Sequence, residues 1–282
     1  MPCSKTFFRI IRICAVSLYS FIKTPVSDLD DLIGAYRQSL SAPLDGMWEH
    51  FTHTADHYAI KLGAKIWGYC AVNAEHNLLQ FSVDTAADAR QIFSDLLTEL
   101  NVTGATLASF ETHALALCMD QQKSVSVNAC LYQMPPERCV DPASFAAGDS
   151  FKLVGADDIA AAIAFAVETL GMNEGWLNGY FGDLVQKEQL NALWRGGKII
   201  ATGECRVSES QRPFADVGMV VGSECRGQGI ATNVLRALGR LCEDRGLKAI
   251  CSTDRDNIPA QKAIAKAGFV CHHRMLAFGF SG

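Results

Sequence analysis

The sequence contains no Cys-x-x-Cys pair and no group of Cys and His residues at metal-ligand spacing. His50, His53 and His57 have a loose helical spacing, but no carboxylate or cysteine pattern accompanies them, so no metal site is expected. The 11 cysteines are dispersed and odd in number. This pattern predicts reduced thiols in a cytoplasmic protein rather than a disulfide framework.

Blocks of basic residues are also missing. The chain has 25 Lys and Arg against 30 Asp and Glu, which gives a net charge of -5. Without a basic patch or basic residues interleaved with aromatics, nucleic acid is not expected as a partner. An acidic balance is compatible with a cationic substrate that carries an amine.

The sequence lacks an apolar run that is long enough to cross a bilayer. The stretch from Ile10 to Ile22 resembles the core of a signal peptide, but Arg12 interrupts it and no Ala-x-Ala-type cleavage site follows. We expect residues 1–18 to be an N-terminal extension and expect no membrane attachment. A leader or an anchor is the alternative.

What is present is enough apolar sequence for a substantial core, since 49% of the 282 residues are hydrophobic. In the first part, the pattern predicts strands at 21–23, 58–61, 66–72, 78–83, 105–110 and 124–133 and helices near 28–40 and 92–100. In the second, it predicts strands at 151–154, 190–195, 198–207, 217–221, 249–252 and 269–278 and helices at 157–170, 230–245 and 259–266. We divide the chain into an extension, 1–18, a first domain, 19–134, a linker, 135–149, and a second domain, 150–282.

The two parts follow similar patterns. Gly63-Ala64-Lys65-Ile66 corresponds to Gly196-Gly197-Lys198-Ile199, and Val83, Ile92, Leu96 and Leu97 correspond to Val221, Ile230, Val234 and Leu235. The turn between strand and helix differs, because Arg226-Gly227-Gln228-Gly229 stands where the first part has Asp88-Ala89-Arg90-Gln91. We interpret the chain as two copies of one α+β unit, of which only the second has a glycine-rich turn. Chance agreement between common strand–helix units is the alternative.

The glycine-rich turn connects the strand at 217–221 to a helix that starts at Ile230. Free N–H groups and the helix dipole favour an anion at such a place, and Gly227 and Gly229 let a phosphate approach the backbone. Arg226 can add a charge-assisted contact. The spacing matches neither the dinucleotide fingerprint nor the Walker A loop. An ordinary glycine-rich turn is the alternative.

Two motifs together resemble the GNAT acetyltransferase superfamily. Residues 221–231 resemble its Arg/Gln-x-x-Gly-x-Gly/Ala signature, and Asn257-x-x-Ala260 with Lys266-Ala267-Gly268-Phe269 resembles its later motif. The resemblance covers residues 151–278. It implies an α+β fold of two tandem GNAT-like domains, each a mixed, mostly antiparallel sheet flanked by helices, with a degenerate first copy that binds no coenzyme.

The resemblance also implies how acetyl-CoA is bound as co-substrate. Backbone amides from Gly227 to Ala231 would hold its pyrophosphate, and the strand from Met219 to Val221 would separate from its neighbour and pair with the pantetheine arm. The coenzyme-binding positions implied are Met219, Val220, Val221, Arg226, Gly227, Gln228, Gly229, Ile230, Ala231 and Asn257.

Acetyl transfer needs a base for the amine proton, polarisation of the thioester carbonyl and a proton for the thiolate. Asp216 stands where family members often carry the carboxylate that accepts the proton, and Glu204 can face the same cleft. Solvated positions at strand ends are the alternative for both. The carbonyl would be polarised by a backbone amide near Val221. The family's acid is a Tyr seven residues after the Asn, but that position here is Ile264.

The segment 171–183 corresponds to the wall of the family's acceptor pocket. Trp176, Tyr180 and Phe181 are therefore expected to bind the substrate, with packing in the core as the alternative. The function predicted is N-acetyl transfer from acetyl-CoA to a primary amine of a small molecule or a protein, by a monomer or homodimer. An acyl-CoA-binding sensor without turnover is the alternative that Ile264 leaves open.

Overall fold

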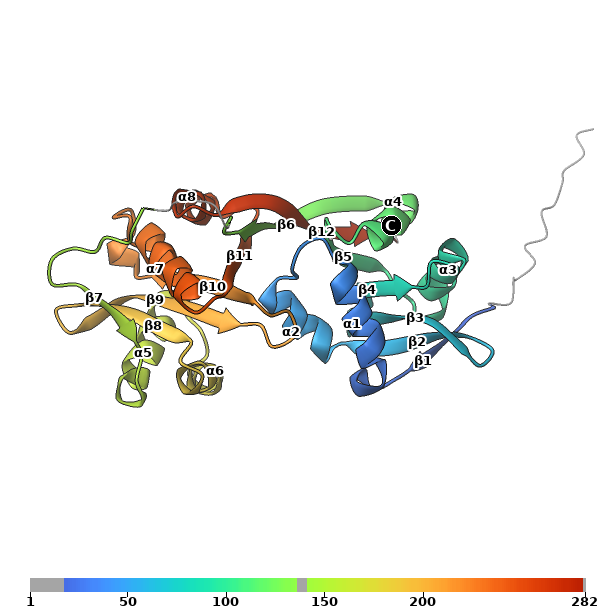
Figure 1. The fold of residues 1–282 in the computed structure, drawn as a ribbon, viewed down its shortest axis with the longest axis horizontal. Coiled ribbons are helices and arrows are strands. Elements are labelled where there is room, and N and C mark those ends of the chain that lie inside the picture. Colours follow the sequence, from blue (N-terminus) through green and yellow to red (C-terminus); the bar gives the residue numbers. More distant parts are fainter. Residues whose placement is uncertain (1–17, 136–140, 281–282) are drawn as a thin grey trace, which may run out of the picture.

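The computed structural model describes residues 18–135 and 141–280. The predicted extension at 1–18 therefore lies outside the described residues apart from its last position, and so does the linker segment 136–140. Within the described residues, one sheet of twelve strands runs along the molecule in the order β1-β2-β3-β4-β5-β12-β6-β11-β10-β9-β8-β7 (Figure 1).

In chain order, β1 to β6 belong to the first half of the chain and β7 to β12 to the second half. Their bounds are β1 Ser20–Lys23, β2 Asp56–Leu62, β3 Lys65–Val72, β4 Asn77–Val83, β5 Gly104–Ala108, β6 Ser124–Gln133, β7 Ser150–Leu153, β8 Leu190–Arg195, β9 Lys198–Val207, β10 Phe214–Val221, β11 Lys248–Asp254 and β12 Val270–Gly279.

The helices also divide evenly between the halves. They are α1 Asp30–Ser39, α2 Gly46–Thr54, α3 Ala89–Glu99, α4 Thr112–Gln121, α5 Ile159–Leu170, α6 Glu174–Gln186, α7 Ile230–Asp244 and α8 Ile258–Lys266. Short 3-10 turns precede α1 and α5, at Val26–Leu29 and Ala156–Asp158. A third 3-10 turn, Ser223–Cys225, precedes α7, and the described residues of the first half contain no counterpart to it.

Both halves have the same order of strands and helices, which confirms the tandem repeat expected from the sequence. The strand order reads the same from either end when each strand of the first half is exchanged for its counterpart in the second, β1 for β7 and so on to β6 for β12. The halves are therefore related by an approximate twofold axis between β6 and β12. A chance agreement of unrelated units does not produce this symmetry.

Each half gives its last strand to the other half. β6 pairs with β11 of the second half, β12 pairs with β5 of the first, and β6 and β12 pair with each other in antiparallel fashion (Figure 1). Across this junction, Tyr132 of β6 lies opposite Cys251 on one side and Cys271 on the other. Because backbone hydrogen bonds cross in both directions, the two halves form one continuous sheet.

The helices lie on two faces of the sheet. α3 and α4 cover one face of the first half and α7 and α8 the matching face of the second, while α1 and α2, and α5 and α6, cover the other face (Figure 1). The helix α7 illustrates why: Ile230, Val234, Leu235 and Leu238 lie along one side and are buried against β9 and β10. Six cysteines of the described residues are buried free thiols, namely Cys70, Cys118, Cys130, Cys205, Cys242 and Cys251.

The predicted strands agree with those observed to within a few residues, and three helices were missed. α2, α4 and α6 are short or flat in hydrophobic pattern, so helical spacing alone does not identify them. Asp45 and Asn173 cap α2 and α6 by accepting hydrogen bonds from Trp48 and Trp176, at 3.1 and 3.0 Å. These caps are the signal that could have located two of the missing helices. No helix in the described residues is long and apolar enough to cross a membrane.

Candidate active site

The strand β10 is paired with its neighbour β11 along only part of its length. It pairs in parallel with β11 only from Phe214 to Asp216, whereas its antiparallel pairing with β9 continues to Val221. From Ile250 onward, β11 pairs with β6 of the first half along its other edge. The backbone of Met219 to Val221 therefore has no strand partner on the β11 side, and a wedge-shaped gap opens in the sheet there, as the resemblance implies.

The turn after β10 leads into the start of α7. Gly227 and Gly229 both have φ of +77°, a conformation that L-residues with a side chain adopt at a cost. A Cβ atom built on either glycine meets nothing within 4 Å, so open space rather than protein lies in front of each. No side chain caps α7. The first N–H groups of this helix are thus available to an anion.

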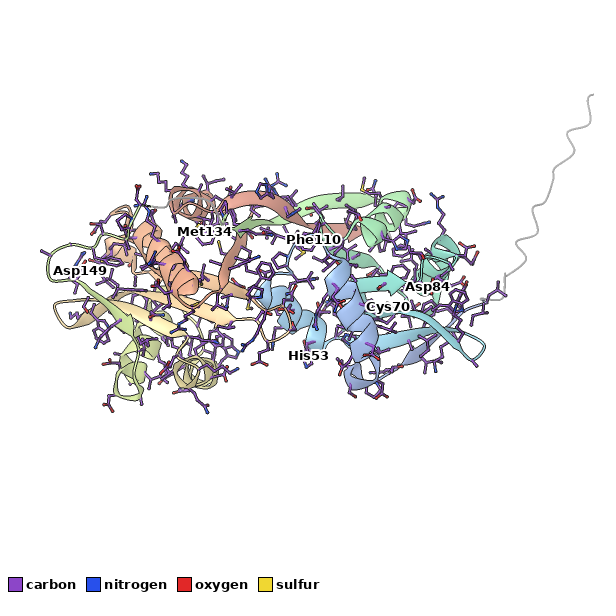
Figure 2. The ribbon with its side chains drawn as sticks, viewed as in Figure 1. His53, Cys70, Asp84, Phe110, Met134 and Asp149 are labelled. Atoms are coloured by element: carbon purple, nitrogen blue, oxygen red, sulfur yellow. The ribbon has the colours of Figure 1, made fainter. Side chains whose placement is uncertain are left out.

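Side chains of the second half hold the turn in this shape. Arg226 donates from Nε to the carbonyl of Val221 at 3.3 Å, which links the turn to the end of β10. Arg195 donates to Gln228 at 3.4 Å and forms two hydrogen bonds of 2.8 Å with Asp149, whose position before β7 is labelled in Figure 2. The turn is therefore fixed from β8, which carries Arg195, and from the segment that precedes β7.

Asp216 lies on the face of β10 opposite to α7, within the paired part of the strand. Its side chain is only 6% exposed and pairs with Arg206 at 3.1 Å. It also accepts a hydrogen bond of 3.1 Å from the backbone N–H of Gly46, the first residue of α2. Burial raises the pKa of Asp216 to about 7, while Arg206 and the Gly46 N–H act in the opposite direction.

Glu204 lies two residues before Arg206 on β9 and opposite Gly218 of β10. Side chains at paired and alternate positions share a face of the sheet, so Glu204, Arg206 and Asp216 all face α6 and α2. Glu204 is 16% exposed and pairs with Arg206 at 3.3 Å. It also accepts a hydrogen bond of 2.7 Å from the hydroxyl of Tyr180. The structure thus brings the two predicted carboxylates together around one guanidinium.

The aromatic residues of α6 take different positions. Tyr180 donates to Glu204, and its pKa is raised by burial and by Glu204. Trp176 stacks on Tyr180 with ring centroids 4.7 Å apart and is half exposed. Phe181 is 3% exposed and packs with Leu177 and Leu184 in the core, so it does not reach the cleft surface. Of the three aromatics, Trp176 and Tyr180 are therefore the ones that are at least partly exposed.

The two parts of the later motif lie at the start of α8 and at its end. The side chain of Asn257 caps α8 by accepting a hydrogen bond of 3.2 Å from the N–H of Ala260. Ile264 is 3% exposed and packs against the α7 core with Phe269. The position that carries a Tyr in the resemblance is therefore a buried apolar contact here. In the described residues, no group of His, Cys, Asp and Glu could hold a metal ion.

Comparisons with known proteins agree with this geometry. Residues 25–135 match the family described as Acetyltransferase (GNAT) domain, and residues 160–269 match the Acetyltransferase (GNAT) family. An acetyltransferase of the GNAT family from Colwellia psychrerythraea is 34% identical, with a TM-score of 0.86, over 93% of this chain and 99% of that one. The chain belongs to the GNAT acetyltransferase family.

Two further structures are similar in fold. A GCN5-related N-acetyltransferase from Sphaerobacter thermophilus has a TM-score of 0.70 at 14% identity, over 95% of this chain and 97% of that one. A tandem GNAT protein from the clavulanic acid biosynthesis pathway has a TM-score of 0.63 at 15% identity, over 94% and 99%. No curated protein sequence matched. The tandem arrangement is thus found in other GNAT proteins.

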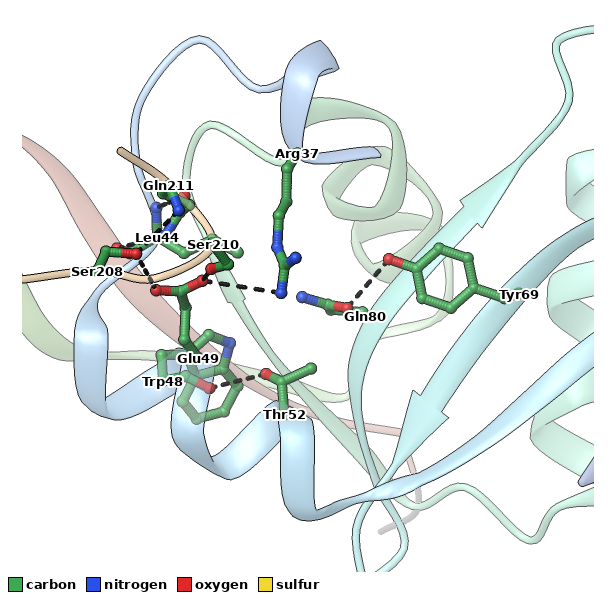
Figure 3. Close-up of polar contacts among 10 residues, drawn as sticks. All are labelled: Arg37, Leu44, Trp48, Glu49, Thr52, Tyr69, Gln80, Ser208, Ser210 and Gln211. Atoms are coloured by element: carbon green, nitrogen blue, oxygen red, sulfur yellow. Dashed lines mark hydrogen bonds and ion pairs between the residues drawn. The ribbon is translucent and has the colours of Figure 1, made fainter. Parts of the chain in front are cut away.

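The first GNAT half differs from the second at both ends of the corresponding cleft. Asp88 accepts a hydrogen bond of 3.1 Å from the N–H of Gln91 and so caps α3, the counterpart of α7, with a carboxylate of the protein itself. On the face that corresponds to that of Glu204 and Asp216, Tyr69 and Gln80 are almost fully buried and share a hydrogen bond of 3.0 Å (Figure 3). A cavity of about 420 Å³ remains near the end of β4, lined in part by Trp67 and Phe110.

The first half also holds the loop that follows β9. The backbone of Leu44 forms two hydrogen bonds with the side chain of Gln211, at 2.9 and 3.3 Å. Glu49 of α2 accepts hydrogen bonds from Ser208, at 3.0 Å, and from Ser210 (Figure 3). These contacts keep α2 against the strands that carry the carboxylates.

Sequence reasoning missed two residues of this site, Arg206 and Gly46. Arg206 could have been found from the alternation of β9, because it shares a face with Glu204, provided that the pairing with β10 was known. For Gly46 the sequence offers no comparable signal, since Gly46 and Asp216 belong to different halves and lie 170 positions apart.

Proposed function

We propose that the second half of this GNAT protein transfers an acetyl group from acetyl-CoA to a primary amine. Two features together support the proposal most strongly. The pairing between β10 and β11 ends early, and no side chain caps the start of α7, which follows Gly227 and Gly229. The gap offers unpaired backbone groups, and the turn offers N–H groups that favour an anion. The capped α3 of the first half lacks the second feature, which supports one coenzyme per chain.

The described residues fit the parts of acetyl-CoA. The amides from Gly227 to Ala231 would hold the pyrophosphate, with Arg226 beside them, and open space in front of both glycines leaves room for it. Met219 to Val221 would pair with the amides of the pantetheine arm, and Asn257 would contact that arm from the start of α8. The thioester supplies an activated acetyl group and a thiolate leaving group.

We assign the general base to Glu204 rather than to Asp216. The Glu204 side chain is more exposed, 16% against 6%, and lies nearer to the open part of β10, opposite Gly218. Asp216 is enclosed by Arg206 and the start of α2. In the reaction, the amine nitrogen bonds to the acetyl carbon, the carbon–sulfur bond breaks, and the amine proton passes to Glu204 and then to solvent.

The leaving thiolate does not need a protein acid. Free thiols have pKa values near 8.5, so a thiolate is a competent leaving group close to neutral pH. This explains how catalysis can proceed although Ile264 is apolar and buried. A backbone amide near Val221 would polarise the thioester carbonyl.

The acceptor site would lie between α6 and α2 over the carboxylates. Two carboxylates and one guanidinium leave a net negative charge at the base of this site. Trp176, which is half exposed and stacks on Tyr180, forms an aromatic wall beside it. A cation is attracted to both features. A small amine and an amine on a protein both satisfy this chemistry. The first half would serve as scaffold in the place that a partner subunit takes in single-domain members.

The proposal is tested by thiol release from acetyl-CoA in the presence of a panel of small amines and peptides, with the acetylated product identified by mass spectrometry. We expect release that depends on the amine and is strongly reduced, to a residual rate that can still be measured, in Glu204→Gln, while acetyl-CoA still binds. Tight coenzyme binding with no release above hydrolysis on any amine would instead support a sensor, the function that Ile264 at the acid position leaves open.

A further inference from the structure

Arg206 is the centre of a polar cluster whose members come from three elements. Its Nη1 lies 3.3 Å from the carboxylate of Glu204 and donates a hydrogen bond of 2.9 Å to the hydroxyl of Tyr180. Its Nη2 lies 3.1 Å from Asp216. Burial acts to lower the pKa of Arg206, but the two carboxylates and Tyr180 raise it above its ordinary value. The guanidinium is therefore a fixed positive charge that orients all three partners.

The first half reaches this cluster through the start of α2. Gly46 donates its backbone N–H to the same Asp216 oxygen, Oδ2, that pairs with Arg206. A Cβ atom on Gly46 would lie 2.7 Å from that oxygen, so a residue with a side chain could not make the same approach. The absence of a side chain at Gly46 thus allows α2 to dock directly on Asp216, and α2 is held there by Glu49 and the loop after β9.

We propose that Arg206 is a positioning residue for Glu204, and that α2 of the first half completes the acceptor site by fixing Asp216, which in turn fixes Arg206. The proposal rests on the function proposed above, because it assumes that Glu204 takes the amine proton. Without Arg206, two carboxylates on one face of β9 and β10 would lack a shared partner, and Glu204 would keep the hydrogen bond from Tyr180 but lose the ion pair that fixes its orientation toward the amine. The first half would then be part of the acceptor machinery although it holds no coenzyme.

A double-mutant cycle tests whether Arg206 acts through Glu204. Arg206→Gln should lower kcat/KM for the amine by about tenfold or more while the affinity for acetyl-CoA stays within about twofold, and Arg206→Lys should restore part of the loss because it keeps the charge without the planar fork. In a Glu204→Gln background, Arg206→Gln should cause little further loss. Losses that simply add would overturn the proposal. If Arg206→Gln folds poorly, Arg206→Lys serves for the same cycle.

Two glycines of the first half offer a matched pair. Gly46→Ala places a methyl group against Asp216 and should lower kcat/KM for the amine several-fold with acetyl-CoA affinity unchanged. Gly34→Ala, in α1, makes the same change where nothing lies within 4 Å, and should have no effect on either quantity. Equal activity of Gly46→Ala, Gly34→Ala and the wild type would overturn the role of α2.

Amide hydrogen exchange provides a readout that does not depend on turnover. In Arg206→Gln, the Gly46 amide should exchange about tenfold faster or more. Arg206 acts to lower the pKa of the buried Asp216, so without it Asp216 is protonated at neutral pH and accepts more weakly than a carboxylate does. The amide of Trp48, which bonds to Asp45 at 3.1 Å, is the control in the same helix and should not change. Equal rates at Gly46 in both proteins, or equal acceleration at Trp48, would contradict the link. Absence of any amine-dependent release by the wild type would refute the proposed function and the role of Glu204, and the exchange data would then decide the link alone.

Discussion

Replacement of Gly229 by aspartate should abolish acetyl-CoA binding without unfolding the protein. Gly229 has φ of +77°, where a residue with a side chain costs about 1 kcal/mol, and its Cβ would point into open space. A carboxylate near the start of α7 recovers about 0.3–1 kcal/mol from the helix dipole, as Asp88 caps α3 in the first half. The free energy of unfolding should therefore change by no more than about 1 kcal/mol.

The loss of binding should be far larger. Two unit charges 4 Å apart near a protein surface repel by about 4 kcal/mol, which corresponds to about a thousandfold in affinity before screening by salt. We expect a reduction of at least about 100-fold in a calorimetric titration with acetyl-CoA. Gly229→Ala separates the steric part from the charge and should lose less.

The counterpart in the first half is the control for this prediction. Gln91→Asp introduces the same carboxylate near the start of α3, where Asp88 already occupies the N–H groups. It should leave acetyl-CoA affinity unchanged. Unchanged affinity in Gly229→Asp, or a comparable loss in Gln91→Asp, would refute the assignment of the phosphate site to the second half.

Three further predictions concern pH, packing and the acid position. Burial raises the pKa of Glu111 to about 7. The stability linked to its neutral form is therefore present below about pH 4.5 and is lost as pH rises toward 7. We expect Glu111→Gln to unfold at a higher temperature than the wild type at pH 8, with a smaller difference at pH 5. Gly203→Ala should cost about 1–3 kcal/mol in denaturant unfolding, because its Cβ would lie 2.9 Å from Val234 of α7, and an unchanged midpoint would contradict the packing. Ile264→Tyr should destabilise the fold by a similar amount without raising kcat, and a faster enzyme would show that a missing acid limits turnover.

Local structure could be predicted where the sequence pattern is strong. β8 and β9 were predicted at their observed bounds because two strand-like runs flank the Gly196-Gly197 turn, and α7 was predicted because its apolar positions recur at helical spacing. Asp216 could be placed on the strand that leads to the glycine-rich turn, and Glu204 on the strand before it, while their roles in catalysis stay predictions. These features depend on residues that are close in the chain.

The remaining features depend on pairing between distant segments. The exchange of β6 and β12 brings together residues about 150 positions apart, and no local pattern distinguishes pairing within a half from pairing across the halves. The burial of Asp216 by α2 was missed for the same reason. Phe181 was expected at the acceptor surface, and its burial follows from the orientation of α6, which the sequence does not reveal.

A crystal structure with acetyl-CoA would test the central claim most directly. Our account predicts one coenzyme per chain, with the pyrophosphate on the amides from Gly227 to Ala231 and the arm in the gap between β10 and β11, next to Glu204. The cavity near the end of β4 should hold none. Coenzyme in the first half, or in both halves, would contradict the account.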